Sequence, residues 1–212
     1  MKTNIMKRWI FYMMGLVILA LGVTLTIKGH LLGLGSWDVF HYGLWQTFGL
    51  TIGSWSIIVG AVIVIFTAVM TREWPRLGVY VNMLSIGIFI DFFNWLLPNF
   101  EGWTQHTIVF SIGLLVMSFG VAFYITPNLG AGPRDSLMLL MVDKFGLKIS
   151  VARNIMEFSA AVGGYLLGGP VFIGTLVIVF GLGKLIEAWL PLTRRLMVLF
   201  LGAEDKNIIK VI

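Results

Sequence analysis

Six runs of mostly apolar residues, each long enough to cross a bilayer, constrain this chain more than any other feature of its sequence. A helix of about 20 residues spans roughly 30 Å of hydrocarbon and satisfies its own backbone groups. Hydrophobic residues make up 58% of the 212 positions and charged residues 12%, a balance unlike that of water-soluble domains. The sequence therefore predicts an all-α integral membrane protein without a soluble domain. The predicted spans are 9–27, 52–70, 77–97, 107–125, 151–167 and 171–190.

Basic residues are distributed unevenly around these spans. Connections 98–106 and 168–170 contain no Lys or Arg, whereas the other connections and both termini hold nearly all of them. Since cytoplasmic loops are enriched in Lys and Arg, both termini are predicted to lie in the cytoplasm. The first apolar run is too long for a signal-peptide core, so we expect it to remain as a span. We expect one membrane domain over 1–212, with a cytoplasmic tail over 192–212.

The two halves of the chain resemble each other. With one residue deleted, GLVILALGVTLTIKGHLLGLGSWDVFHYGLWQTFGL in the first half aligns with GLLVMSFGVAFYITPNLGAGPRDSLMLLMVDKFGL in the second. Each half holds three predicted spans, an odd number, so the second half is predicted to lie inverted relative to the first. Inverted repeats, here about 9–98 and 107–191, are typical of secondary transporters. The aligned pairs are Gly15 with Gly113, Gly22 with Gly120, Gly33 with Gly130, Gly35 with Gly132, Asp38 with Asp135, Gly78 with Gly174, Gly87 with Gly183, and Asp91 with Glu187.

A glycine loop precedes a short helix in each half. Gly33 and Gly35 precede the first, while Gly130 and Gly132 precede the second, which has Pro133 in the favoured first turn. About 12 residues make roughly 18 Å of helix, too short to span hydrocarbon. These segments are predicted to be re-entrant or interfacial helices, and the sequence leaves both alternatives open.

Asp38 and Asp135 stand at the starts of the two short helices. If the helices are re-entrant, their backbone requires a polar interior, and the two carboxylates would lie at the gates of a site between the halves. If the helices are interfacial, each carboxylate only stabilises the first turn, by at most about 1 kcal/mol. The sequence favours neither interpretation.

Charged residues inside the spans are further candidates, because a central Asp or Lys costs about 2.5–3.5 kcal/mol on insertion. Asp91 lies deep in the third span and is a candidate pathway residue. Lys184 and Glu187 are expected to pair on one helical face. Arg153 and Glu157 have the spacing of a pair as well, although Glu157 lies deeper and is equally a candidate for the site.

Several classes of activity have no support in the sequence. The chain has no cysteine, which excludes disulfides, thiol catalysis and cysteine-ligated metals. His30 and His41 are isolated polar residues, and no metal-binding motif, nucleophile elbow or phosphate-binding loop is present. We therefore expect no enzyme, cofactor, metal or nucleic-acid partner. Several tryptophans are interpreted as interfacial belt residues rather than a ligand cage, namely Trp37, Trp45, Trp55, Trp74 and Trp103.

Two pairs of motifs resemble the signatures of the YczE-like bacterial membrane proteins. The first pair is GLGSWDVFHYGL with GLTIGSWSIIVG, and the second is GAGPRDSLMLLM with VARNIMEFSAAVGGYLLGG. The resemblance covers nearly the whole chain and extends in broad plan to the YitT-type membrane proteins. It implies six spans in a bacterial cytoplasmic membrane, but no substrate and no catalytic role. The matching positions are Gly35, Trp37, Asp38, Gly132, Pro133, Arg134, Asp135, Arg153 and Glu157.

The leading hypothesis for function is a secondary transporter or exporter of a small solute, and the buried carboxylates offer a route for coupling to protons. A passive channel and a non-transporting accessory or scaffold protein are the alternatives. Partners would then be the lipid bilayer, an unknown small solute and, given the glycine-rich helix faces, a possible second copy in a homodimer. The candidate pathway residues are Asp38, Arg134, Asp135, Arg153, Glu157 and Asp91, together with the loop glycines Gly33, Gly35, Gly130 and Gly132.

Overall fold

The computed structural model describes residues 2–130, 132–147 and 149–201, and every regular element in these ranges is a helix. The elements are α1 (Lys2–Lys28), the 3₁₀ turn η1 (His30–Leu32), α2 (Ser36–Phe48), α3 (Ile52–Thr71), α4 (Leu77–Leu96), α5 (Gly102–Ile125), α6 (Pro133–Phe145), α7 (Ile149–Leu166) and α8 (Ile173–Leu201). The prediction of a helical chain with two short helices, α2 and α6, is therefore confirmed.

Within the described residues, five helices are long and apolar enough to cross a membrane: α1, α3, α4, α5 and α8. The predicted fifth span forms α7, a helix of 18 residues that is not among these five. Its first half contains Arg153, Asn154 and Glu157, which lower its apolarity. The structure thus supports a multi-span helical membrane protein, and the sixth span stays a prediction.

The last helix is longer than its sequence predicts. α8 continues through Pro191 to Leu201, although we expected the span to end near residue 190. The extension is held by packing, since Met197 and Leu201 lie in a cluster with Phe11 and Phe123. The first part of the predicted tail over 192–212 is therefore helical, while 202–212 lie outside the described residues.

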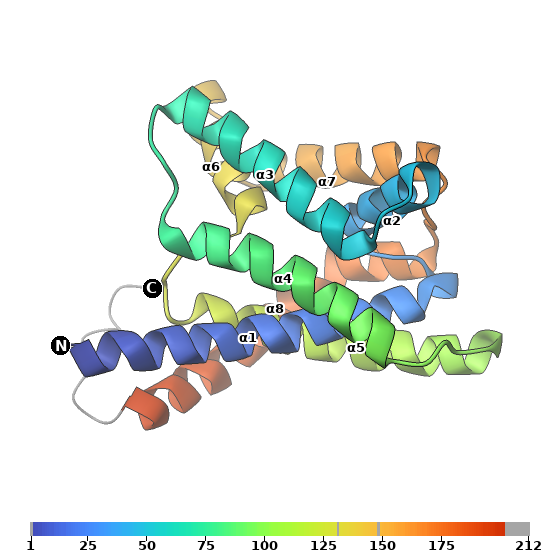
Figure 1. The fold of residues 1–212 in the computed structure, drawn as a ribbon, viewed down its shortest axis with the longest axis horizontal. Helices are drawn as coiled ribbons and strands as arrows, with labels where there is room; N and C mark the ends of the chain where they lie inside the picture. The colour runs from blue at the N-terminus through green and yellow to red at the C-terminus, as the bar shows by residue number, and fades with distance from the viewer. Residues whose placement is uncertain (1, 131, 148, 202–212) are drawn as a thin grey trace.

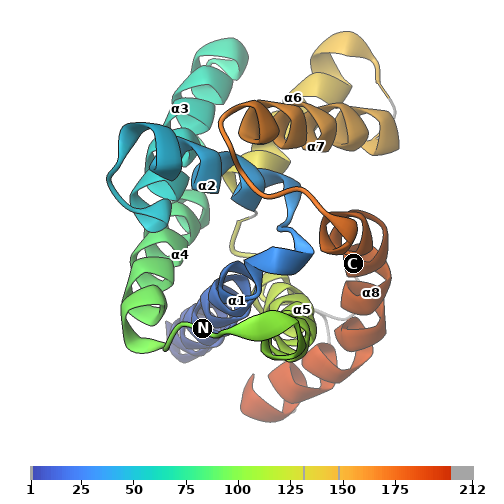
Figure 2. The same ribbon diagram turned by 90° about the vertical axis from the view of Figure 1, so that its right-hand side faces the viewer.

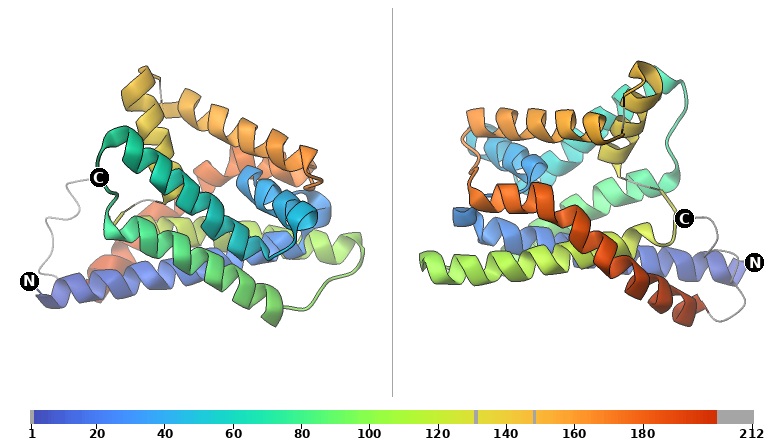
Figure 3. Two further views of the ribbon diagram at one scale, coloured as in Figure 1. Left: turned by 45° about the horizontal axis from the view of Figure 1, so that its top comes forward. Right: turned by 180° about the vertical axis from the view of Figure 1, so that it is seen from behind.

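The long helices α1 and α5 lie side by side and run in opposite directions (Figure 1). Helix α4 packs against α1, and α8 packs against α5. Helix α2 packs mainly against α7, and α3 packs against both α4 and α6. Seen end on, α3, α6 and α7 lie across the molecule from α1 and α5, with α4 and α8 on the two flanks (Figure 2). The first turns of α1 and the last turns of α8 lie at the same end (Figures 1 and 3).

Glycines allow α1 and α5 to approach closely. A side-chain carbon at any of four glycines would collide with the backbone of the facing helix, so only hydrogen fits there. Each contact has a counterpart at the positions that the two halves align. The contacts are Gly15 with Tyr124, Gly113 with Thr26, Gly22 with Met117, and Gly120 with Leu19.

A second set of matched contacts joins each glycine loop to the other half of the chain. Gly78, at the start of α4, lies against the carbonyl of Leu129 in the loop before α6. Gly174, at the start of α8, lies against the carbonyl of Leu32 in the turn before α2. Each half therefore supports the loop that leads into the other half's short helix.

Candidate functional site

A cavity of about 340 Å³ lies between the starts of α2 and α6. Most of the side chains that line it are aliphatic or methionine, and the charged ones come from the starts of α2 and α6 and from α7. The wall includes residues from every α-helix of the described chain, from α1 to α8. Such a volume and lining are typical of a pocket for a small molecule.

The glycine loops bring both short helices to this cavity. Gly33 has a φ of 95° and Gly130 has a φ of 142°, values that residues with a side chain rarely adopt. After these turns, α2 and α6 start near the middle of the molecule and run outward toward opposite ends (Figures 1 and 3). Gly35 and Gly132, the residues before the two helices, both line the cavity.

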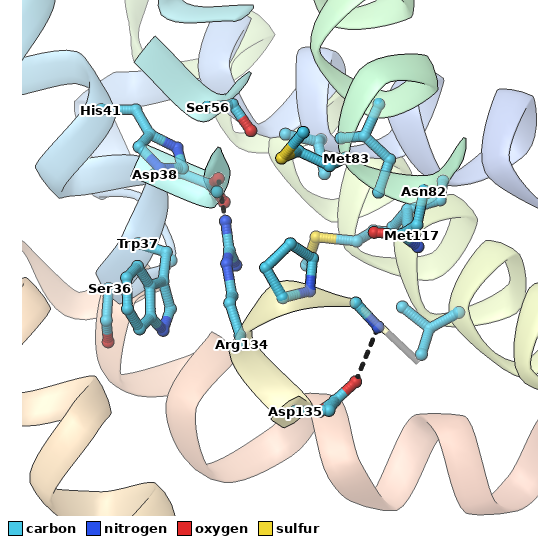
Figure 4. A pocket seen from close by; sticks show the side chains of 18 of the residues that line it. Ser36, Trp37, Asp38, His41, Ser56, Asn82, Met83, Met117, Arg134 and Asp135 are labelled. Carbon is cyan, nitrogen blue, oxygen red and sulfur yellow. Dashed lines mark hydrogen bonds and ion pairs between the residues drawn. The ribbon is translucent and has the colours of Figure 1, made fainter. Parts of the chain in front are cut away.

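Arg134 connects the two halves across the cavity. Its guanidinium, from the first turn of α6, lies 3.9 Å from the carboxylate of Asp38 in the first turn of α2. The same guanidinium stands 5.0 Å above the ring of Trp37 (Figure 4). The Asp38 side chain is 10% exposed and that of Arg134 is 42% exposed, so the carboxylate is closed in and the guanidinium is open.

Asp135 has a different role from its counterpart Asp38. Its carboxylate accepts a hydrogen bond of 3.3 Å from the backbone N–H of Gly132, which satisfies one of the free donors at the start of α6 (Figure 4). The residue also lines the cavity. Asp135 therefore both stabilises the first turn of α6 and forms part of the cavity wall.

Arg153 and Glu157 reach the cavity from α7, but not as a pair. Among the described residues, the contact between Arg134 and Asp38 is the one ion pair within 4.0 Å. Of the two alternatives left open for Arg153 and Glu157, the structure shows no ion pair between them, and both residues line the cavity. The expected pairing of Lys184 with Glu187 is wrong, since both side chains are exposed on α8 and do not meet. Helical spacing allows both contacts, but the side chains do not meet in the structure.

Asp91 does not line the cavity. Its carboxylate accepts hydrogen bonds from the backbone N–H of Gly53, at 2.9 Å, and from the hydroxyl of Thr51. These groups stand at the start of α3, so Asp91 satisfies free donors at a neighbouring helix terminus. The prediction of Asp91 as a pathway residue finds no support in this geometry, which gives the carboxylate a structural role.

Sequence reasoning missed several polar residues of the cavity. Trp37, interpreted as a belt residue, is 8% exposed and lies in the cavity wall. His41 and Asn82 are buried and line it too. The sequence did contain a signal for Trp37, because this residue follows a glycine loop and aligns with Arg134 of the second half. Asn82 had none, since a single amide in an apolar span is ordinary.

Three donors in this wall have no hydrogen-bond partner among the described residues: Ser36 Oγ, Trp37 Nε1 and Asn82 Nδ2. These three atoms expose almost no surface, so they lie within the wall and do not face the open space of the cavity. The cavity shows no comparable group of metal ligands among the described residues. The described residues contain no group of three or more His, Asp or Glu side chains placed to hold a metal.

Comparison with known proteins finds relatives whose names state no activity. A model described as a family of unknown function, DUF6198, matches residues 6–191. The chain is 47% identical to the uncharacterized membrane protein YczE of Bacillus subtilis, over 93% of this chain and 92% of that protein. It is 30% identical to the uncharacterized protein YyaS of the same organism, over 89% and 94% of the two chains. No solved structure matches the chain.

Proposed function

The chain belongs to the DUF6198 family, whose function is unknown, and from its charged interior cavity we propose that it is a secondary transporter of a small solute. The resemblance to YczE-like membrane proteins predicted from its motifs is confirmed by the match to YczE itself. In this proposal the protein moves the solute without chemically changing it.

One observation carries the proposal: Arg134 and Asp38, from different halves of the chain, meet across a solute-sized cavity inside a membrane protein. Intramembrane charges are expensive, and in membrane proteins they mark substrate and ion pathways. A scaffold protein would have no use for such a cavity, and its stability would improve if apolar side chains filled it.

The site is proposed to lie at the interface of two inverted repeats. The matched glycine contacts support this plan, because α1 and α5 touch at pairs of positions that the repeat alignment exchanges. The supports of the two loops, Gly78 on Leu129 and Gly174 on Leu32, exchange in the same way. In this plan α2 and α6 are the re-entrant helices, and the positive ends of both face the binding site.

The two sides of the site differ in exposure, which favours an opening on one side. At the start of α2, Ser36, Trp37 and Asp38 are all buried, whereas Arg134 and Asp135 of α6 are only partly buried. The outer end of α6 points toward the end of the molecule where α1 starts and α8 ends (Figure 1). We assign that end to the cytoplasm because basic residues gather there, including Arg72, Arg76 and Arg194.

Flux into proteoliposomes under an imposed pH gradient tests the proposal, with a broad panel of solutes. The parent is compared with Asp38→Asn and Asp135→Asn, and the matched control is Asp143→Asn, an exposed residue of α6 outside the cavity. Gradient-driven flux that is lost in the two cavity variants and kept in the control supports a transporter. Flux that does not saturate with the concentration of any solute and does not depend on the pH gradient would indicate a passive channel. No flux of any solute would favour the accessory role.

A further inference from the structure

Helix α8 has one side that no other part of the described chain covers. Its inward side contributes Ile178, Leu182 and Ile186 to the cavity wall. The opposite side, which we call the outer face of α8, is exposed, and helical spacing places four residues on it: Phe180, Gly183, Lys184 and Glu187. In the view from behind, α8 lies in front of the other helices (Figure 3). It is the least buried of the five helices that are long and apolar enough to span a membrane.

The two charged residues of this outer face lie at membrane depth. Helix α8 follows α5 from Gly174, which lies against the ring of Phe110, to Thr193, whose hydroxyl is 3.0 Å from that of Thr126. Lys184 and Glu187 lie between these two contacts, alongside a helix that spans the bilayer. Neither forms an ion pair in the described ranges of the chain. Charged side chains within spans normally face other protein surfaces, so this position calls for a covering partner.

The first half of the chain shows what covers the aligned residues. Gly87 and Asp91 of α4 align with Gly183 and Glu187 of α8. Helix α3 packs on α4, and the Asp91 carboxylate accepts a hydrogen bond of 2.9 Å from the N–H of Gly53 in α3. On α8, a carbon added at Gly183 meets nothing within 4 Å, and α7 packs against α2 and α6 instead. The outer face of α8 therefore has residues of the kind that receive a helix in the first half, without a helix on them.

The order of the charges identifies the occupant as another copy of the same face. In a two-fold interface, residue i of one subunit contacts residue j of the other, and j contacts i. Helical spacing places Lys184 on one side of Phe180 and Glu187 on the other, so two parallel copies of α8 bring unlike charges together twice. Gly183 leaves room for the two backbones to approach closely.

We propose that the outer face of α8 binds a second copy of this chain, in a two-fold dimer whose Lys184 and Glu187 side chains pair between copies. The glycines of α7 serve a different contact, since a carbon at Gly164 would collide with the backbone of Phe40 in α2. This dimer goes beyond the proposed function and does not depend on transport.

Single cysteines test the contact directly, because the chain has none of its own. Phe180→Cys, at a position that is 74% exposed, is introduced into the full-length protein, which is then reconstituted at a low protein-to-lipid ratio and oxidised. A disulfide-linked dimer is expected. The matched control is Leu84→Cys, at the aligned and 45% exposed position of α4, which should stay monomeric. No link at Phe180→Cys, or an equal yield at Leu84→Cys, overturns the dimer.

A second pair of cysteines distinguishes a second copy from a movement of α7 within one chain. Asn154 of α7 aligns with Ile57 of α3, whose side chain lies against Gly87. In the variant with Asn154→Cys and Gly183→Cys, the proposal expects no link within a chain. A disulfide inside one chain, in place of one between copies, would assign the outer face to α7 and overturn the dimer.

Exchanging the charges tests the pairing. Lys184→Glu and Glu187→Lys each place like charges opposite each other, so each variant alone is expected to self-associate at least about tenfold more weakly. A mixture of the two variants should associate like the parent, because unlike charges then meet again. Energy transfer between labelled chains in liposomes measures association, and Asp143→Lys, an exposed residue of α6, is the control. Losses that the mixture does not restore would contradict the pairing, and the Phe180→Cys result stands without any change of charge.

Discussion

The guanidinium of Arg134 in α6 lies 3.9 Å from the carboxylate of Asp38 in α2, across the cavity. The two residues are 96 positions apart in the sequence. The contact brings a partly exposed guanidinium to a nearly buried carboxylate. It joins the two short helices that the glycine loops carry into the molecule.

Removing the guanidinium should destabilise the protein through the carboxylate left behind. Arg134→Gln is expected to cost about 1–2 kcal/mol, less than for a fully buried pair because Arg134 is partly exposed. In the double variant with Asp38→Asn, part of this loss should be restored, because no unpaired charge remains. Thermal unfolding in detergent measures both effects. Lys144→Gln, near the exposed end of α6, is the control, and strictly additive losses would contradict the coupling.

Alanine at the first glycine loop should disturb the entry into α2. At Gly33 the backbone has a φ of 95°, and an added carbon would meet the hydroxyl of Thr175 and the backbone nitrogen of Phe172. Gly33→Ala is therefore expected to cost about 1–3 kcal/mol. Gly181→Ala on α8, where an added carbon meets nothing within 4 Å, should be neutral or stabilising by up to about 1 kcal/mol. Thermal unfolding of the two variants side by side checks the difference, and equal effects would contradict it.

Neutralising Asp91 should reduce stability and spare transport. Asp91→Asn weakens the acceptor for Gly53 N–H and the Thr51 hydroxyl at the start of α3, with an expected loss of about 1–2 kcal/mol. Flux per folded molecule should equal that of the parent, because the residue lies outside the cavity wall. A selective loss of flux with unchanged unfolding temperature would restore Asp91 as a pathway residue.

A cysteine placed in the cavity should react from the cytoplasmic side. Since the chain has no cysteine, single variants give an unambiguous signal. Arg153→Cys on the cavity wall is expected to be labelled by a membrane-impermeant thiol reagent from the same side as Arg72→Cys. Gln105→Cys, at the other end of the molecule, should be labelled from the opposite side. Labelling of the cavity position together with Gln105→Cys would reverse the proposed opening.

Local sequence signals predicted the elements that frame the site. Apolar length predicted the spans, and glycine followed by Ser or Pro predicted the starts of α2 and α6. These features are readable because span length and turn conformation depend on neighbouring residues alone. α7 was harder, since its charges lower its apolarity while several of its residues, including Arg153, face an interior cavity.

Contacts between distant parts of the chain could not be predicted in the same way. The four-residue spacing of Arg153 and Glu157 suggested an ion pair, but a charged side chain in a membrane protein turns toward whatever polar space packing leaves open. Asp91 showed the reverse case, because a carboxylate deep in an apolar run satisfies the start of a neighbouring helix. Trp37 looked interfacial because the sequence does not show that its helix begins inside the molecule.

Trp37 and Arg134 occupy aligned positions in the two halves, and they stack on each other. In a dimer of two identical half-length chains, a position that contacts its own copy would carry the same residue on both sides. Two arginines there would repel, and two tryptophans would offer no charge to Asp38. In the proposed inverted-repeat plan, joining the halves in one chain lets the two aligned positions carry different residues, so that a cation and an aromatic ring meet there.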